Sequence, residues 1–188
     1  MQTKRNLEKG FTMIEALIAI AIFLVLSAAV AKLFLTYFTL YNVQQSTIDV
    51  VHSASTLENA VHTAAMQADA IVSSRAFSGV TYTTGSTTLI LRLPSITSSG
   101  DIIANTYDYE LFYASSTNAY QIISLGTGSA RMGGTRRLSN SISNLTFLYN
   151  NGTPSQSTSV DALVSTRGTY KNHTVDTTVR QKTHFRNL

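Results

Sequence analysis

The sequence predicts an α+β protein in which one long N-terminal helix is followed by an antiparallel β-sheet that packs on it. Residues 16–31 form an apolar run with Ser27 as its only polar residue. Apolar residues then recur at spacings of three and four as far as Ile71, which is the period of a one-faced helix. Beyond residue 78 the chain is rich in Ser, Thr, Asn and Gly, and β-branched runs alternate with glycine turns. That pattern is typical of short antiparallel strands.

The apolar run is the expected membrane segment. Sixteen helical residues extend for roughly 24 Å, which is less than the roughly 30 Å hydrocarbon core of a bilayer, so one flank must complete the crossing. If the N-terminal flank is used, Glu15 enters the hydrocarbon, where an ionisable group is unfavourable and marks a functional role. No Lys, Arg or His lies between Phe11 and Ala31. We therefore expect the cation that neutralises Glu15 to come from outside this segment.

The sequence KGFTMIEAL at residues 9–17 resembles the class III signal of type IV pilins and type II secretion pseudopilins. In that family a membrane peptidase cuts a short basic leader after the glycine, and the new N-terminal phenylalanine is methylated. The resemblance implies cleavage between Gly10 and Phe11 and methylation of Phe11. It also implies a role for Glu15 in filament assembly, in which its carboxylate pairs with the terminal ammonium of Phe11 in a neighbouring subunit.

The resemblance and the residue pattern together predict three parts. These are a leader, a transmembrane helix, and an exported pilin-like domain at residues 42–188. The expected boundaries are 1–10 for the leader, 11–41 for the transmembrane and filament-core helix, 42–75 for the amphipathic helix of the exported domain, and 78–188 for its β-sheet. Residues 136–138, 142–149 and 184–188 are similar in pattern to the C-terminal portion of J-type minor pseudopilins. That similarity implies a minor subunit.

Within the expected sheet, short apolar runs flanked by turn residues predict individual strands. The expected strands are a hairpin of 80–82 with 87–93, a second hairpin of 107–113 with 119–125, and the strands 142–149, 160–165 and 174–185. Residues 126–134 are expected to be a flexible connector, and Arg167-Gly168-Thr169 is the expected turn between the last two strands.

The family resemblance also implies partners and a location. The implied partners are other pilin or pseudopilin subunits, the prepilin peptidase and methyltransferase, the inner-membrane assembly platform, and membrane lipid. Leader cations at Lys4, Arg5 and Lys9 keep the N-terminus in the cytoplasm by the positive-inside rule. We therefore expect a single-pass protein of the cytoplasmic (inner) membrane that later enters a pilus or pseudopilus outside the cytoplasm.

The charge balance gives little support to nucleic-acid binding. The formal net charge is +4, and three leader cations less Glu8 account for +2 of it. The remaining basic cluster is a candidate basic surface loop that contains Arg131, Arg136 and Arg137. Contact with nucleic-acid phosphates is one interpretation; a solvated loop or a subunit contact is favoured because few other cations are nearby.

The sequence shows no pattern that predicts catalysis, a metal site or a cofactor. It contains no cysteine, and no nucleophile elbow, Walker loop or dinucleotide fingerprint is present. His52 and His62 are ten residues apart on one expected helix, too far to share an ion. Asp108 and Glu110 alternate on one strand face and could form a carboxylate pair, but two acids at this spacing are as readily a solvated strand face opposite the tyrosines. The function predicted is structural rather than enzymatic; the alternative is a single-pass, membrane-anchored adhesin or ligand-binding protein.

Overall fold

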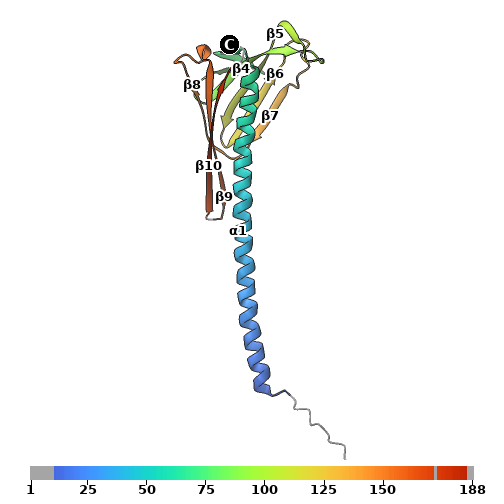
Figure 1. Ribbon diagram of the computed structural model, residues 1–188, viewed down its shortest axis with the longest axis vertical. Coiled ribbons are helices and arrows are strands. Elements are labelled where there is room, and N and C mark those ends of the chain that lie inside the picture. Colours follow the sequence, from blue (N-terminus) through green and yellow to red (C-terminus); the bar gives the residue numbers. More distant parts are fainter. Residues whose placement is uncertain (1–10, 172, 186–188) are drawn as a thin grey trace, which may run out of the picture. The chain divides into compact units, whose positions relative to one another are not determined.

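The computed structural model describes residues 11–171 and 173–185. The expected leader, including Gly10, lies outside the described residues. The chain divides into two compact units, Met1–Gln44 and Gln45–Leu188. The helix α1, Met13–Gln67, contributes residues to both units, and strands follow it (Figure 1). The α+β class predicted from the sequence is confirmed.

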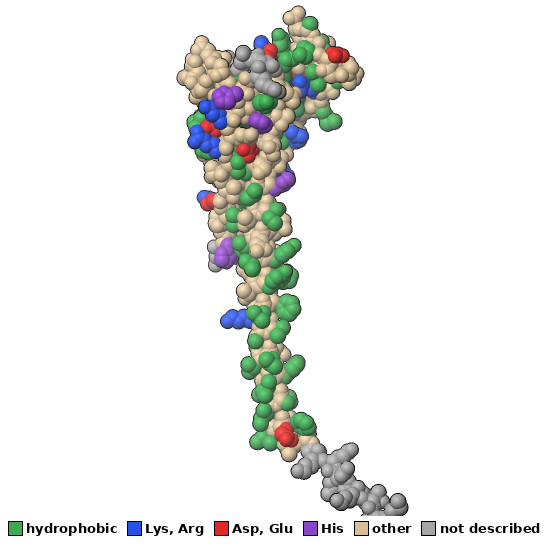
Figure 2. All heavy atoms as spheres, in the orientation of Figure 1, with side chains coloured by type: hydrophobic (Ala, Val, Ile, Leu, Met, Phe, Trp, Pro, Cys, Tyr) green, Lys and Arg blue, Asp and Glu red, His purple; other side chains and the backbone are tan. Residues whose placement is uncertain are grey.

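The described part of the N-terminal unit consists of residues 11 and 12 and the beginning of α1, residues 13–44, which we call the N-terminal part of α1. It has no buried residue, and large apolar side chains such as Leu33 and Phe34 are exposed. Hydrophobic side chains dominate its visible surface (Figure 2). By length and composition this part of the helix could cross a membrane. Its side chains therefore need lipid or other chains to cover them.

The remainder of the helix, residues 45–67, is the C-terminal part of α1 and belongs to the second unit. One face of it is buried, and half of the buried residues on that face are alanines. The buried residues are Val50, Ala54, Leu57, Val61, Ala64 and Ala65. Alanines bring the helix backbone close to the sheet that packs on this face. The buried face predicted from the spacing of apolar residues is confirmed.

The largest sheet has five antiparallel strands in the order β1-β4-β5-β6-β7. The strands are β1 Ala70–Ile71, β4 Thr88–Ile96, β5 Ile102–Ser115, β6 Asn118–Ser124 and β7 Gly134–Ser139. Strands β5 and β6 form the hairpin predicted for 107–113 and 119–125. Alternate residues of β5 therefore point to opposite faces of this sheet.

Two smaller antiparallel sheets complete the C-terminal unit. The three-stranded sheet has the order β10-β9-β8 and the two-stranded sheet pairs β2 with β3. The strands are β2 Ser74–Phe77, β3 Val80–Thr83, β8 Ile142–Tyr149, β9 Ser159–Tyr170 and β10 His173–His184, with a 3₁₀ turn η1 at Pro154–Gln156. Strands β9 and β10 lie side by side along their whole length (Figure 1).

Two arginine–aspartate pairs join β9 to its edge neighbour β10. Arg167 Nε lies 2.7 Å from Asp176 Oδ1, and Arg180 Nη2 lies 2.6 Å from Asp161 Oδ2. Arg167 and Asp176 are directly opposite in the strand register, whereas Arg180 is opposite Leu163 and reaches Asp161 diagonally. The bidentate contact with Arg167 lowers the pKa of Asp176 below its ordinary value. The two pairs therefore favour this register over a slipped one.

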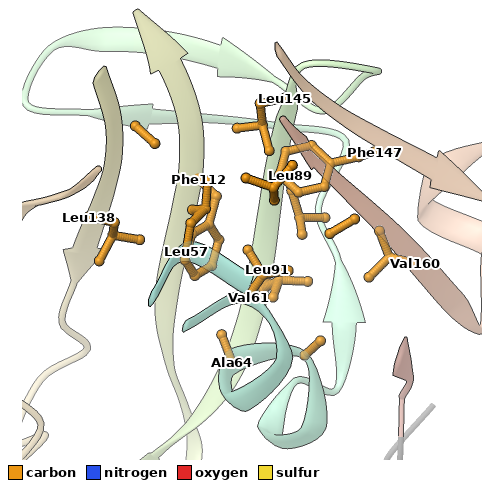
Figure 3. Close-up of a cluster of buried hydrophobic side chains, with 14 of the residues drawn as sticks. Leu57, Val61, Ala64, Leu89, Leu91, Phe112, Leu138, Leu145, Phe147 and Val160 are labelled. Carbon is orange, nitrogen blue, oxygen red and sulfur yellow. The ribbon is translucent and has the colours of Figure 1, made fainter. Parts of the chain in front are cut away.

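The main core lies between α1 and the sheets. Leu57 and Val61 of α1 contact a cluster that includes Leu91 of β4, Phe112 of β5 and Phe147 of β8 (Figure 3). A second, smaller cluster of Phe77, Ile90 and Leu111 lies on the other face of the five-stranded sheet, with Tyr109 and Tyr113 packed against it. The tyrosine face of β5 expected from the sequence is thus partly covered by β2 and β3.

The helix ends earlier than expected, at Gln67 rather than near residue 75. The chain leaves the helix at this point because the next residues pair with strand β4. The backbone N–H of Asp69 donates to the carbonyl of Arg92 at 2.9 Å, and the Arg92 guanidinium pairs with the Asp69 carboxylate. Ile71 was expected on the helix face but pairs with Leu91 in the sheet. An isoleucine at a compatible spacing suits either element, and the sheet contacts decide between them.

Three of the strand predictions are wrong in their pairing or extent. Residues 80–83 pair with β2 rather than with β4, so the hairpin expected around Gly85 does not form. Strand β7 begins inside the segment expected to be a connector. Residues 167–169 lie within β9 rather than in a turn, and the strand continues to Tyr170. Gly168 is required there because a Cβ atom would lie 2.6 Å from both Ser46 Oγ and Val50 Cγ2.

Candidate functional site

The start of α1 brings Thr12 and Glu15 together. Glu15 Oε2 accepts hydrogen bonds from the Thr12 backbone N–H and from the Thr12 hydroxyl, both at 2.8 Å. The Glu15 backbone N–H in turn donates to Thr12 Oγ1 at 3.4 Å. This reciprocal arrangement is a capping box, which satisfies N–H groups that an α-helix leaves unpaired at its start. The carboxylate is thereby held at the positive end of the helix dipole.

The surroundings of this carboxylate are apolar and uncovered within the chain. Phe11, Met13 and Ile14 are all exposed, and Glu15 itself is exposed. Among the described residues, no ion pair involves Glu15. The capping box therefore supplies hydrogen-bond donors but no positive side chain. Sequence reasoning identified Glu15 but missed Thr12, although a threonine three residues before a glutamate is a recognisable signature of this box.

The three arginines expected in one basic loop lie in different surroundings. Arg131 is mostly buried and its Nε lies 3.0 Å from Oδ2 of Asp108, whose side chain is fully buried. Its Nη1 donates to Gln67 Oε1 and its Nη2 donates to the carbonyl of Pro94. Arg131 is thus a structural link between the connector, α1 and β4. It is not available as part of a surface loop, because a buried carboxylate requires its charge.

Arg136 and Arg137 are consecutive residues of β7 and both are exposed. Arg136 Nη2 donates to Gln121 Oε1 at 2.5 Å, whereas Arg137 lies opposite Tyr120 in the register and has no hydrogen-bond or ion-pair partner among the described residues. Consecutive strand residues point to opposite faces. The three arginines therefore do not form a single free basic surface.

Asp108 and Glu110 lie on the buried face of β5, which corrects the expectation of a solvated face. The face opposite Tyr109 and Tyr113 is the one turned toward α1. Asp108 is fully buried and accepts hydrogen bonds from Ser95, the Gly126 N–H and Ser129. Glu110 is 6% exposed, and burial raises its pKa. Sequence alternation alone could not reveal which face of the strand met the helix.

The histidines of the helix lie apart from one another and have separate surroundings. His62 Nδ1 lies 2.8 Å from Thr183 Oγ1 of β10, and His52 is exposed. In the described part of the chain, no group of three or more His, Cys, Asp or Glu side chains could hold a metal ion. The two candidate sites are thus the start of α1, where hydrogen bonds hold a carboxylate, and the buried face of β5–β7, where hydrogen bonds and an ion pair hold two further carboxylates.

These features define a class of protein: an apolar helix of membrane-spanning length with an acid at its start, continuous with the helix of a folded α+β domain. Comparison with known families agrees with that class. Residues 5–31 match the prokaryotic N-terminal methylation motif. The chain therefore carries a type IV pilin-like class III signal, as the resemblance implied. No curated protein and no solved structure matches the chain.

Proposed function

We propose that this protein is a minor, J-type-like structural subunit of a type IV pilus or a type II secretion filament. It is made as a prepilin, cut by prepilin peptidase between Gly10 and Phe11, methylated at Phe11, and assembled through residues 11–41. The observation that carries the proposal is the methylation motif at the start of a helix whose apolar surface the chain leaves uncovered. Such a surface is stable in lipid or among the helices of other subunits.

Transfer of this helix from lipid to a helical bundle gives little hydrophobic free energy, because both surroundings are apolar. Selectivity in assembly must therefore come from packing and from polar contacts. Glu15 is the one acid in the first thirty residues of the mature chain. In the proposed filament its carboxylate meets the ammonium of Phe11 in a neighbouring subunit, and a buried pair of this kind is stable only when both partners are present.

The capping box prepares Glu15 for this pairing. Cleavage after Gly10 leaves Thr12 as the second residue of the mature chain, so the Thr12 N–H and hydroxyl hold the carboxylate beside the new terminus. These two hydrogen bonds lower the free energy of the ionised carboxylate in an apolar environment. We infer that the box keeps the Glu15 carboxylate oriented until a neighbouring ammonium arrives.

The mature N-terminus is the first test. The protein isolated from its native host should lack residues 1–10 and carry one additional methyl group on Phe11, as measured by intact-mass and peptide mass spectrometry. A Gly10→Leu variant should keep the leader, because a bulky side chain at the cleavage position blocks processing. A wild-type protein that retains its leader would overturn the assignment and favour the anchored alternative.

Two substitutions at Glu15 separate its charge from its capping role. Glu15→Ala should enter the membrane normally but fail to enter filaments, because both the charge and the box are lost. Glu15→Gln keeps a side-chain oxygen for Thr12 and should still fail, because no ammonium is neutralised. Asp49→Ala, at an exposed acid on the C-terminal part of α1, is the matched control. Normal incorporation of Glu15→Gln would show that only the cap matters.

In the proposed setting the protein lies in the cytoplasmic membrane with its N-terminus in the cytoplasm, contacts the inner-membrane assembly platform, and then joins other pilin subunits. A membrane-anchored ligand-binding protein is the second candidate, and the polar crevice beside Glu110 is the observation that favours it. Retention of the leader and monomeric behaviour in detergent would support that candidate. Cleavage and co-purification with other pilin-like subunits would support the filament subunit.

A further inference from the structure

A crevice of about 360 Å³ lies between the C-terminal part of α1 and the buried face of β5–β7. Its sheet wall contains Glu110, Gln121 and Arg136, one from each of three neighbouring strands. Its helix wall contains hydrogen-bonding side chains, among them Asn59 and Thr63. The volume is at the lower end of the range for small-molecule sites.

The sheet wall carries a chain of two hydrogen bonds that connects a cation to an anion. Arg136 Nη2 donates to Gln121 Oε1 at 2.5 Å, and Gln121 Nε2 donates to Glu110 Oε2 at 2.8 Å. Gln121 is 4% exposed and Glu110 is 6% exposed, so both side chains are fixed deep in the wall. The amide of Gln121 therefore holds a positive and a negative group a set distance apart.

Each charged end of this chain keeps unused hydrogen-bonding capacity. Within the described residues, Gln121 is the only hydrogen-bond partner of the Glu110 side chain and also of the Arg136 side chain. Glu110 Oε1 therefore remains as an acceptor, and the other guanidinium N–H groups of Arg136 remain as donors. A carboxylate that is this deeply buried, with one oxygen free at the crevice, gains from a donor that enters the crevice.

The helix wall offers groups that suit the space between the two charges. The side chains of Thr56, Asn59 and Thr63 line the crevice, and none of them has a hydrogen-bond partner among the described residues. Gln67, at the end of the same wall, is already held by Arg131. Apolar atoms are contributed by Ala60, Ala64 and Ile123. The crevice thus combines one acceptor end, one donor end and a small apolar area.

We propose that this crevice binds a free α-amino acid, with its ammonium group at Glu110 and its carboxylate at Arg136. An α-amino acid carries an ammonium and a carboxylate on a single carbon atom. Its two charges are therefore close enough together to meet Glu110 and Arg136 at the same time, alongside the Gln121 amide that bridges these two side chains. A simple amine leaves Arg136 without an anion, and a neutral sugar offers a full charge to neither end of the chain of hydrogen bonds. The Ala and Ile atoms favour a small apolar side chain on the ligand.

The first experiment uses ligand derivatives and the full-length wild-type chain in detergent micelles. Isothermal titration with L-valine should show saturable one-site binding. N-acetyl-L-valine, which lacks the ammonium, and L-valinamide, which lacks the carboxylate, should each bind at least about tenfold more weakly. Equal affinity for all three compounds, absence of saturable valine binding, or tighter binding of glucose than of valine would overturn the proposal. The comparison requires no variant and so does not depend on any variant folding.

The second experiment assigns the two ends. Glu110→Gln should abolish the preference for valine over N-acetylvaline, and Arg136→Gln should abolish the preference for valine over valinamide. Arg137→Gln is the matched control, because it removes the same charge from the next residue of β7 on the opposite face. Thermal unfolding of each variant checks that it is folded. Equal loss of binding in Arg137→Gln and Arg136→Gln would contradict the assignment. A negative result leaves the filament proposal intact, because that proposal rests on leader processing and on Glu15.

Discussion

The two parts of α1 belong to one helix but differ in what covers their apolar side chains. The N-terminal part, residues 13–44, exposes large side chains, as at Leu33, which is 70% exposed. The C-terminal part, residues 45–67, buries a face in which alanine alternates with a few larger residues, as at Leu57, which is fully buried. The exposed part depends on surroundings that other molecules supply, whereas the buried part depends on this chain's own sheets.

The same contrast separates two carboxylates. Glu15 lies among exposed apolar residues and is stabilised by a capping box that involves only its own first turn. Glu110 lies within the folded unit and is held by a glutamine of the adjacent strand. An acid in the exposed part can meet a group on another chain directly. An acid in the folded unit is reached only by something small enough to enter the crevice.

The largest expected effect comes from the same substitution made in each part of the helix. Leu57→Ala should destabilise the C-terminal unit by about 2–5 kcal/mol, because it leaves a cavity in the main core. Leu33→Ala should change the free energy of unfolding of that unit by less than about 0.5 kcal/mol. Urea unfolding of the full chain in detergent, followed by circular dichroism, measures both values. Similar losses for the two variants would mean that both parts contribute to one folding unit.

A smaller loss of stability is expected from a substitution in β9 at the point where this strand packs closely on α1. Gly168→Ala should destabilise the C-terminal unit by about 1–3 kcal/mol, because the new methyl group meets Ser46 and the stiff side chain of Val50. Gly85→Ala is the control, since a Cβ atom there meets no atom within 4 Å. Thermal unfolding compares the two variants. Equal stability would show that β9 is not tightly packed on the helix at this point.

The smallest expected effect depends on pH and concerns the buried acid. Burial raises the pKa of Glu110 above the ordinary value of 4.5, so the native state binds its proton more tightly than the unfolded state. The contribution of Glu110 to stability is therefore complete below its unfolded pKa and is lost as the pH rises through its folded pKa. Glu110→Gln, which resembles the protonated form, should gain stability relative to wild type as the pH rises from 4 to 7. Melting temperatures measured across that range check this, and a constant offset would contradict it.

Much of the fold could be predicted because it depends on patterns within one element. The periodic spacing of Val50, Ala54 and Leu57 predicted the buried helix face, and alternation predicted the hairpin of β5 and β6. The failures concern choices between elements. Ile71 suits a helix or a strand. The hydrogen bond and the ion pair between Asp69 and Arg92 of β4 place it in a strand. Pairing of β3 with β2 also depends on where the helix ends, which a local pattern does not specify.

The candidate sites show the same limit. Glu15 could be identified from the sequence because a charge within an apolar run is conspicuous, and Thr12 could have been found from its spacing. The crevice could not be predicted, because Glu110, Gln121 and Arg136 come from three strands whose shared face depends on where α1 packs. Arg131 was expected on the surface because its partner, Asp108, is distant in sequence and was itself expected in solvent.

The edge strand of the three-stranded sheet, β10, affects how closely several copies of the protein can lie together. Strand β10 pairs with β9 along one edge, and a long uncovered edge invites the same strand of another molecule to add to the sheet. Lys182 lies on this strand and is exposed, and the like charges of two such lysines oppose this self-addition. Many copies can therefore be held at high local density without their sheets merging into an amyloid-like ribbon.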